Sequence, residues 1–306
     1  MPNQTIDMNN VNSVSFNNNT VNEIYLNNDK IWPVGEEYFL TFSSPNSFTL
    51  SVVDNTKYWN GTLETSTDKT NWTTWSGTSA VSSASNGTKH NLYVRGIGNT
   101  YITGQNATTS KGAWRLNGSN ISISGILATL LDYARIEQGL SPSVSSSVFR
   151  ALFAHPSTSL NTSIIDISKI IIGRHAMMAY SYLQAFRGLS AITKPPVLPF
   201  TQMNDGCYSN MFRDCTSLIY VPKLLAKQLQ LDCYSNMFYN CTSLYVSDTQ
   251  TAQASHAWKI PTNNNIIGTT YSQTNMFYHC LGTRSSSTFA GTTGSQFTYY
   301  TQNEPV

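Results

Sequence analysis

Apolar and polar positions change their spacing along the chain, and the change divides it into three parts. In residues 1–35, short apolar runs such as "VSF" and "IYL" alternate with the turn-forming stretches "NNNT" and "NND". This pattern predicts short strands joined by tight turns. A segment this small cannot bury a core of its own, so we expect it to lean on another surface.

Residues 36–110 carry apolar or aromatic runs separated by turn-forming clusters. The runs are "YFLTFSS", "SFTLSVVD", "GTLETSTD", "TNWTTWSG" and "NLYVRGIG". Strand signals about 8–12 residues apart predict an antiparallel β-sandwich, of the immunoglobulin- or fibronectin-like kind. Trp72 is expected in its core. For Trp59 and Trp75 a core position and an exposed, sugar-stacking position both stay open.

Residues 111–306 contain a repeat. "CYSNMFRDCTSL" begins at Cys207, and "CYSNMFYNCTSL", which agrees at ten of its twelve positions, begins 26 residues later. Aligned on one phenylalanine, looser copies extend the series with steps of 33, 26, 26 and 39 residues; the five positions are Phe153, Phe186, Phe212, Phe238 and Phe277. A period of about 20–29 residues is typical of leucine-rich solenoids, so we expect such a solenoid with a terminal cap.

Within one copy, the apolar spacing predicts local structure. Four residues fall at i, i+3, i+4 and i+7, which is one face of a short α- or 3₁₀-helix; they are Tyr208, Met211, Phe212 and Cys215. The following "SLIYVP" predicts a short strand that Pro222 ends. Such a unit buries its apolar face only by stacking on its neighbours. The predicted fold class is therefore mainly β with short helices.

The cysteines follow the repeat, because they occupy matching places in successive copies and Leu189 takes one of these places. The site therefore suits a small apolar filler. The predicted repeat core is Phe186, Leu189, Cys207, Phe212, Cys215, Leu218, Cys233, Phe238, Cys241, Leu244, Phe277 and Cys280. The spacing does not match the C-x2–4-C of zinc sites. On a helix, Cys207 and Cys215 would be about 12 Å apart, beyond disulfide reach, while a bridge between coils stays open.

Composition narrows the function classes. Charged residues make up 11% of the chain, against about 25% in typical soluble domains. The net charge is +2 without a basic cluster, which argues against nucleic-acid binding. No apolar run reaches the roughly 20 residues of a membrane span.

Candidate chemistry in the sequence is sparse. His175 is expected as a half-buried or capping residue of an Ala/Met/aromatic helix. Asp132 and Asp166 are the carboxylates considered as a glycosidase pair, but nothing in the sequence brings them together. We therefore expect no enzyme activity, no cofactor and no metal.

Two sets of motifs resemble known proteins. "NMFRDCTSLIYVP" and "NMFYNCTSL" resemble BspA-type leucine-rich repeats, and "VNEIYLNNDKIWPVG" is similar to the N-terminal attachment segment of phage structural proteins. The resemblance implies a virion protein: a fibre, a head decoration or a tail-associated protein. It implies attachment to capsid or tail proteins through Tyr25, Leu26 and Trp32, and a repeat domain that contacts a host-surface glycan or protein.

The resemblance also sets expectations for assembly and location. By analogy with phage fibres we expect a homotrimer. The N-terminus lacks the basic and apolar regions of a secretory signal, which fits a particle assembled in the host cytoplasm and released by lysis. The alternative is a bacterial cell-surface adhesin with leucine-rich repeats.

Overall fold

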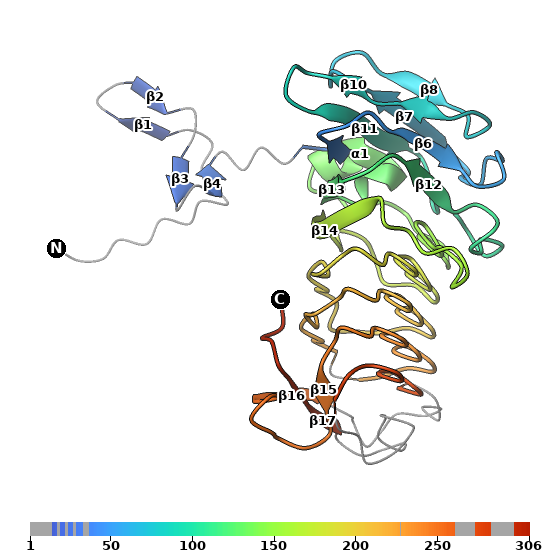
Figure 1. Ribbon diagram of the computed structural model, residues 1–306. Coiled ribbons are helices and arrows are strands. Elements are labelled where there is room, and N and C mark those ends of the chain that lie inside the picture. Colours follow the sequence, from blue (N-terminus) through green and yellow to red (C-terminus); the bar gives the residue numbers. More distant parts are fainter. Residues whose placement is uncertain are drawn as a thin grey trace. The chain divides into compact units, whose positions relative to one another are not determined.

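The computed structural model describes the strands within residues 14–32 and the ranges 37–226, 228–260, 273–282 and 297–306 (Figure 1). The chain forms two compact units, Met1–Glu37 and Tyr38–Val306. The described part contains several sheets and a single short helix, which confirms the mainly β class. Within these ranges, no helix has the length and apolar character needed to cross a membrane.

The first unit contains two antiparallel hairpins. β1 (Val14–Phe16) pairs with β2 (Asn19–Val21), and β3 (Ile24–Leu26) pairs with β4 (Asp29–Trp32). The three predicted attachment residues lie on the second hairpin: Tyr25 and Leu26 on β3, and Trp32 on β4 opposite Ile24. Their side chains lie outside the described part of the structure, so their role stays a prediction.

The second unit begins with two sheets. The larger has the order β14-β13-β5-β11-β7-β8, with β10 also paired to β11, and the smaller has the order β12-β6-β9. The larger sheet consists of β5 (Leu40–Ser44), β7 (Thr62–Ser66), β8 (Thr73–Trp75), β10 (Ala84–Ser85), β11 (His90–Ile97), β13 (Ile121–Ile126) and β14 (Ile164–Ile171). The smaller consists of β6 (Thr49–Val52), β9 (Val81–Ser82) and β12 (Trp114–Asn117). Each of the five apolar runs predicted in residues 36–110 contains one of these strands.

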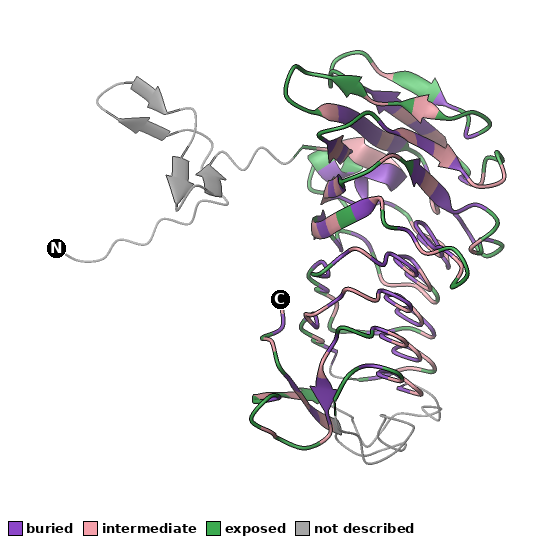
Figure 2. Ribbon diagram, in the orientation of Figure 1, coloured by how far each residue is buried: buried purple, intermediate pink, exposed green. Residues whose placement is uncertain are grey.

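The two sheets share one core (Figure 2). Trp114 of β12 meets Phe42 of β5 at 6.5 Å between ring centroids and Trp75 of β8 at 5.3 Å. Strands β12 and β13 lie beyond residue 110, where the sandwich was expected to end, yet they pair with β6 and β5. Both sheets therefore continue into the region assigned to the repeat, because strand pairing joins segments far apart in sequence.

The tryptophans differ from expectation. Trp59 and Trp75 are buried, whereas Trp72 is only half-buried, so its prediction as a core residue is wrong. Trp72 precedes β8, whose inward side chain is Trp75. Its indole N–H donates to the Lys69 carbonyl at 3.0 Å, and the Arg95 guanidinium lies 4.0 Å from its ring. The ring is thus held at the surface by a cation–π contact.

The helix α1 (Thr129–Glu137) packs on β11. A side chain at Gly96 would collide with the Leu130 carbonyl, so the close approach requires glycine. The buried Asn99 amide donates to that same carbonyl at 3.0 Å and to the Thr62 carbonyl at 2.8 Å. These contacts fix the loop that follows β11.

Beyond β13 the chain forms five stacked coils, whose colours run from yellow-green to orange-red in Figure 1. Their aligned segments are 147–155, 180–188, 206–214, 232–240 and 273–280. A third sheet, with the order β15-β17-β16, lies at the C-terminal end. It consists of β15 (Val246–Ser247), β16 (His256–Ile260) and β17 (Phe297–Thr301).

The helix predicted in each copy is absent. Along the segment, backbone N–H groups donate alternately to a carbonyl of the same coil and to a carbonyl of the next coil. The Met211 N–H donates within its own coil, to the Tyr208 carbonyl at 3.1 Å, while the Tyr208 N–H donates to Cys233 of the next coil at 3.0 Å. This alternation continues along the first four aligned segments. A helix would keep all these bonds within the segment.

The backbone turns at every fourth residue of a coil, where φ is positive. Gly206, Asn210 and Asp214 have φ of 57°, 55° and 64°. Glycine, asparagine and aspartate tolerate this left-handed conformation best. The next coil repeats the pattern at Asp232, Asn236 and Asn240.

The strand predicted to end at Pro222 is also absent. Its residues form single backbone bonds in place of a ladder: the Ile219 N–H donates to the Thr193 carbonyl at 3.1 Å, and the Val306 N–H donates to the Val221 carbonyl at 3.1 Å. The C-terminus thus runs beside this segment.

Candidate functional site

The interior of the coil stack is a column of phenylalanine rings. The five phenylalanines that align the repeat are all buried, and successive rings are 6.1, 5.8, 5.7 and 5.3 Å apart, with interplanar angles of 13° or less. Steps of 33 and 39 residues, in place of 26, therefore leave the register of the rings unchanged. Ring contacts in this range add to the free energy gained by burial.

The column continues at both ends. Trp114 of the smaller sheet lies 6.0 Å from Phe153, and Tyr299 of β17 lies 4.9 Å from Phe277. Below the sheets, the first coil also receives a backbone bond, from the Trp114 N–H to the Leu152 carbonyl at 2.6 Å. The sheets and the coils thus form one continuous core.

All twelve predicted core residues lie in this interior. They are Phe186, Leu189, Cys207, Phe212, Cys215, Leu218, Cys233, Phe238, Cys241, Leu244, Phe277 and Cys280, and none is more than 4% exposed. Three thiols do more than fill space, because each donates to a phenylalanine carbonyl of the preceding coil. The sulfur–oxygen distances are 3.2 Å for Cys215, 3.1 Å for Cys241 and 3.2 Å for Cys280.

The environment of the thiols suppresses nucleophilic chemistry. The five cysteines are buried thiols. Burial raises the pKa of the Cys207 thiol to about 12, and it raises the pKa values of Cys215, Cys233 and Cys241 as well. The reactive form of cysteine is the thiolate, so these side chains stay protonated and inert at neutral pH. In the described ranges no group of three His, Cys, Asp or Glu side chains is placed to hold a metal ion.

His175 is neutral and structural in this fold. Its side chain is 5% exposed, so it is more buried than the half-buried position expected. It also does not lie on a helix, contrary to the prediction. Its Nδ1 lies 2.7 Å from the Ala176 carbonyl and its Nε2 lies 2.6 Å from the Tyr182 hydroxyl. Burial lowers the pKa of His175 to about 4. One ring nitrogen therefore donates to the carbonyl while the other accepts from the tyrosine.

The two carboxylates considered as a catalytic pair have separate local partners. Asp132 accepts from the backbone N–H groups of Arg135 and Gly98, at 3.2 and 3.3 Å. Asp166 accepts from the N–H and the hydroxyl of Ser168, at 2.8 and 2.7 Å. Asp132 therefore links α1 to the residue that follows β11, and Asp166 bonds a neighbouring residue of its own strand, β14.

One outward feature of the coils was missed by the sequence reasoning. The residue after each of the last four column phenylalanines is half-buried at the surface, and these residues form what we call the outer ladder: Arg187, Arg213, Tyr239 and Tyr278. The Arg213 guanidinium lies 4.3 Å from the Tyr239 ring, and that ring lies 5.0 Å from Tyr278. The signal was available, because the residue after the aligned phenylalanine is an arginine or a tyrosine in four successive copies.

A buried carboxylate supports the outer ladder. Asp214, 1% exposed, accepts from the Ser157 hydroxyl at 2.7 Å, from Arg187 Nε at 3.3 Å and from Asn240 Nδ2 at 3.0 Å. Together with Asp214, these partners come from four coils or their connections. A buried charge with this many donors links neighbouring coils.

Comparison with protein-family models, with curated proteins and with solved structures gives no significant match for this chain.

Proposed function

We propose that this chain is a non-enzymatic structural protein of a phage virion, a fibre or decoration protein that displays an adhesive surface. The observation that carries the proposal is the core of the second unit, where aromatic rings and thiols are used for packing through five hydrogen-bonded coils. A rigid stack of this kind suits the display of side chains at a fixed spacing. The outer ladder is then the adhesive face, toward a host-surface glycan or protein.

The same proposal assigns finer folds. The stack is a leucine-rich-repeat solenoid of the BspA type, with the sheet β15-β17-β16 as its terminal cap, and the two N-terminal sheets are an immunoglobulin- or fibronectin-like sandwich. The stacking of equivalent phenylalanines at the repeat period supports the first assignment. The shared core of the two sheets supports the second.

In the proposed particle, residues 1–35 dock onto capsid or tail proteins. The fact that Met1–Glu37 is a separate compact unit supports a docking role distinct from that of the second unit. Tyr25, Leu26 and Trp32 supply the docking contacts, and the protein is a homotrimer that reaches the outside when the host cell lyses.

Deletion of residues 1–35 tests the attachment. We expect the truncated protein to fold and to be absent from purified particles, because its docking hairpins are gone. The measurement is the stoichiometry of the chain in particles, beside its thermal unfolding in isolation. The matched control is Tyr245→Ala, which lies in the second unit and leaves the docking hairpins intact.

A truncated chain that still co-purifies in full stoichiometry would contradict the attachment. Full-length chain found on the surface of uninfected bacteria, with none in particles, would favour the surface adhesin instead.

A further inference from the structure

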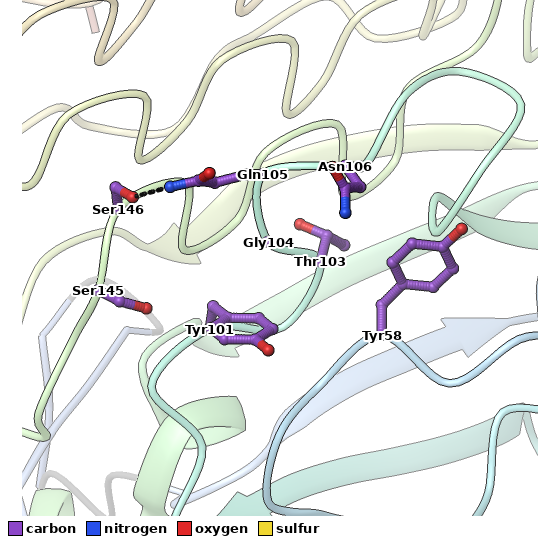
Figure 3. A pocket seen from close by; sticks show the side chains of 8 residues that line it. All are labelled: Tyr58, Tyr101, Thr103, Gly104, Gln105, Asn106, Ser145 and Ser146. Atoms are coloured by element: carbon purple, nitrogen blue, oxygen red, sulfur yellow. Dashed lines mark hydrogen bonds between the residues drawn. The ribbon is translucent and has the colours of Figure 1, made fainter.

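A pocket of about 370 Å³ opens beside the first coil (Figure 3). Three loops build it: the β6–β7 loop carries Tyr58, the loop after β11 carries residues 101–106, and the segment before the first coil carries Ser146. Its volume lies within the roughly 300–1,000 Å³ of small-molecule sites. The predicted functional residues do not line it.

Two tyrosine rings stand on different sides of the pocket (Figure 3), and a glycine backs each of them. A Cβ at Gly104 would lie 3.0 Å from the Tyr101 ring, and one at Gly112 would lie 3.0 Å from the Tyr58 ring. Both glycines also have positive φ, of 68° and 71°. A larger residue at either position would strain the backbone and push the ring into the pocket.

Asp54 fixes the position of Tyr58. The Tyr58 hydroxyl donates to Asp54 Oδ2 at 2.7 Å, and Oδ1 of the same carboxylate accepts the Gly112 N–H at 3.2 Å. The aromatic wall is therefore preorganised before any ligand arrives, which reduces the entropy lost on binding.

The other lining groups are neutral amides and hydroxyls. The Gln105 amide nitrogen donates to the Ser146 hydroxyl at 2.9 Å, and the Thr103 hydroxyl donates to the Arg150 carbonyl at 2.5 Å. The exposed Asn106 amide, with both donor and acceptor atoms, faces the opening between the tyrosines (Figure 3). No lining residue is charged.

We infer that this pocket binds an uncharged sugar residue of a surface glycan. The apolar C–H face of a pyranose packs on an aromatic ring, whose face carries partial negative charge. Its hydroxyls both donate and accept, as the Asn106 and Gln105 amides do. An anionic sugar would bring a charge that no lining residue pairs. The biological role of this sugar binding rests on the proposed adhesive function, whereas the binding itself does not.

The test measures binding by the purified full chain. A glycan array of neutral and sialylated glycans identifies a probe, and calorimetry with the best neutral glycan gives its affinity. We expect Tyr101→Ala and Asn106→Ala each to weaken binding at least tenfold, while Tyr101→Phe, which keeps the ring, stays within about threefold of wild type. Tyr245→Ala, on a distant coil connection, is the matched control.

Two results would overturn the site: no neutral glycan bound, or binding that Tyr101→Ala and Asn106→Ala leave unchanged. Binding confined to anionic glycans would overturn it as well. Circular dichroism establishes that each variant is folded. Incorporation of the same variants into particles is scored separately, so failure of the pocket and failure of the virion proposal give different results.

Discussion

At the scale of single residues, the coils depend on positions with positive φ. The two near-identical coils place glycine, asparagine or aspartate there, whereas the preceding coil uses Tyr180 and Gln184, both at φ of 59°. Residues other than glycine, asparagine and aspartate lose roughly 1–2 kcal/mol of stability in the left-handed region. The earlier coil therefore carries strain that the later two avoid.

Replacing Gln184 by glycine should relieve this strain. The Gln184 N–H donates to Ser209 at 3.0 Å, and glycine keeps that bond. We expect Gln184→Gly to raise the free energy of unfolding by about 0.5–1 kcal/mol, measured by urea denaturation. Thr216→Gly is the control at an equally half-buried position with ordinary φ, and it should lower the free energy of unfolding by a similar amount. A loss of stability in Gln184→Gly would contradict the strain.

At the scale of elements, the sequence located the repeat but not its conformation. The register followed from the phenylalanines, since each occupies the same place in the ring column. The predicted helix was wrong because Tyr208 and Phe212, and likewise Met211 and Cys215, are four residues apart. Over eight residues, a turn repeated every four residues and a helix of period 3.6 bury the same positions. The signal that distinguishes the repeated turn from a helix is the four-residue spacing of Gly206, Asn210 and Asp214, which are residue types that tolerate positive φ.

The packed coils should shield every thiol. We expect none of the five cysteines to react with Ellman's reagent at pH 7.5 in the folded protein, and all five to react in denaturant, because burial makes them inaccessible in the folded state. Ser243→Cys supplies an exposed thiol on the same stack as a positive control. Native thiols labelled as fast as this control, or fewer than five in denaturant, would contradict the packing.

At the scale of the whole molecule, the sheets and the coils belong to one compact unit with a continuous core. The sequence predicted a boundary near residue 110, since the spacing of apolar and turn-forming residues changes there. Strand pairing is nonlocal, so the pattern did not reveal that β12 and β13 complete the earlier sheets. The pocket was missed for the same reason, because its lining comes from three distant loops.

A destabilising substitution in the coils should therefore shift the unfolding transition that is measured by the fluorescence of tryptophans in the sheets. With Trp32 and Trp258 changed to phenylalanine, the remaining four tryptophans lie in the sheet region. In that background we expect Phe212→Ala to lower the free energy of unfolding by about 3–5 kcal/mol, seen equally by tryptophan fluorescence and far-UV circular dichroism. Phe212→Leu should lower the free energy of unfolding by less than Phe212→Ala does. A fluorescence midpoint that stays unchanged would show that the sheets unfold independently.

The near-identity of the stretches at Cys207 and Cys233 has a consequence for inheritance. Their coding sequences can mispair during recombination, and a crossover between them inserts or removes 26 residues. The reading frame survives, and so does the pairing of each backbone donor with the layer above. The length of the stack can thus change by one whole coil at a time without any new packing solution.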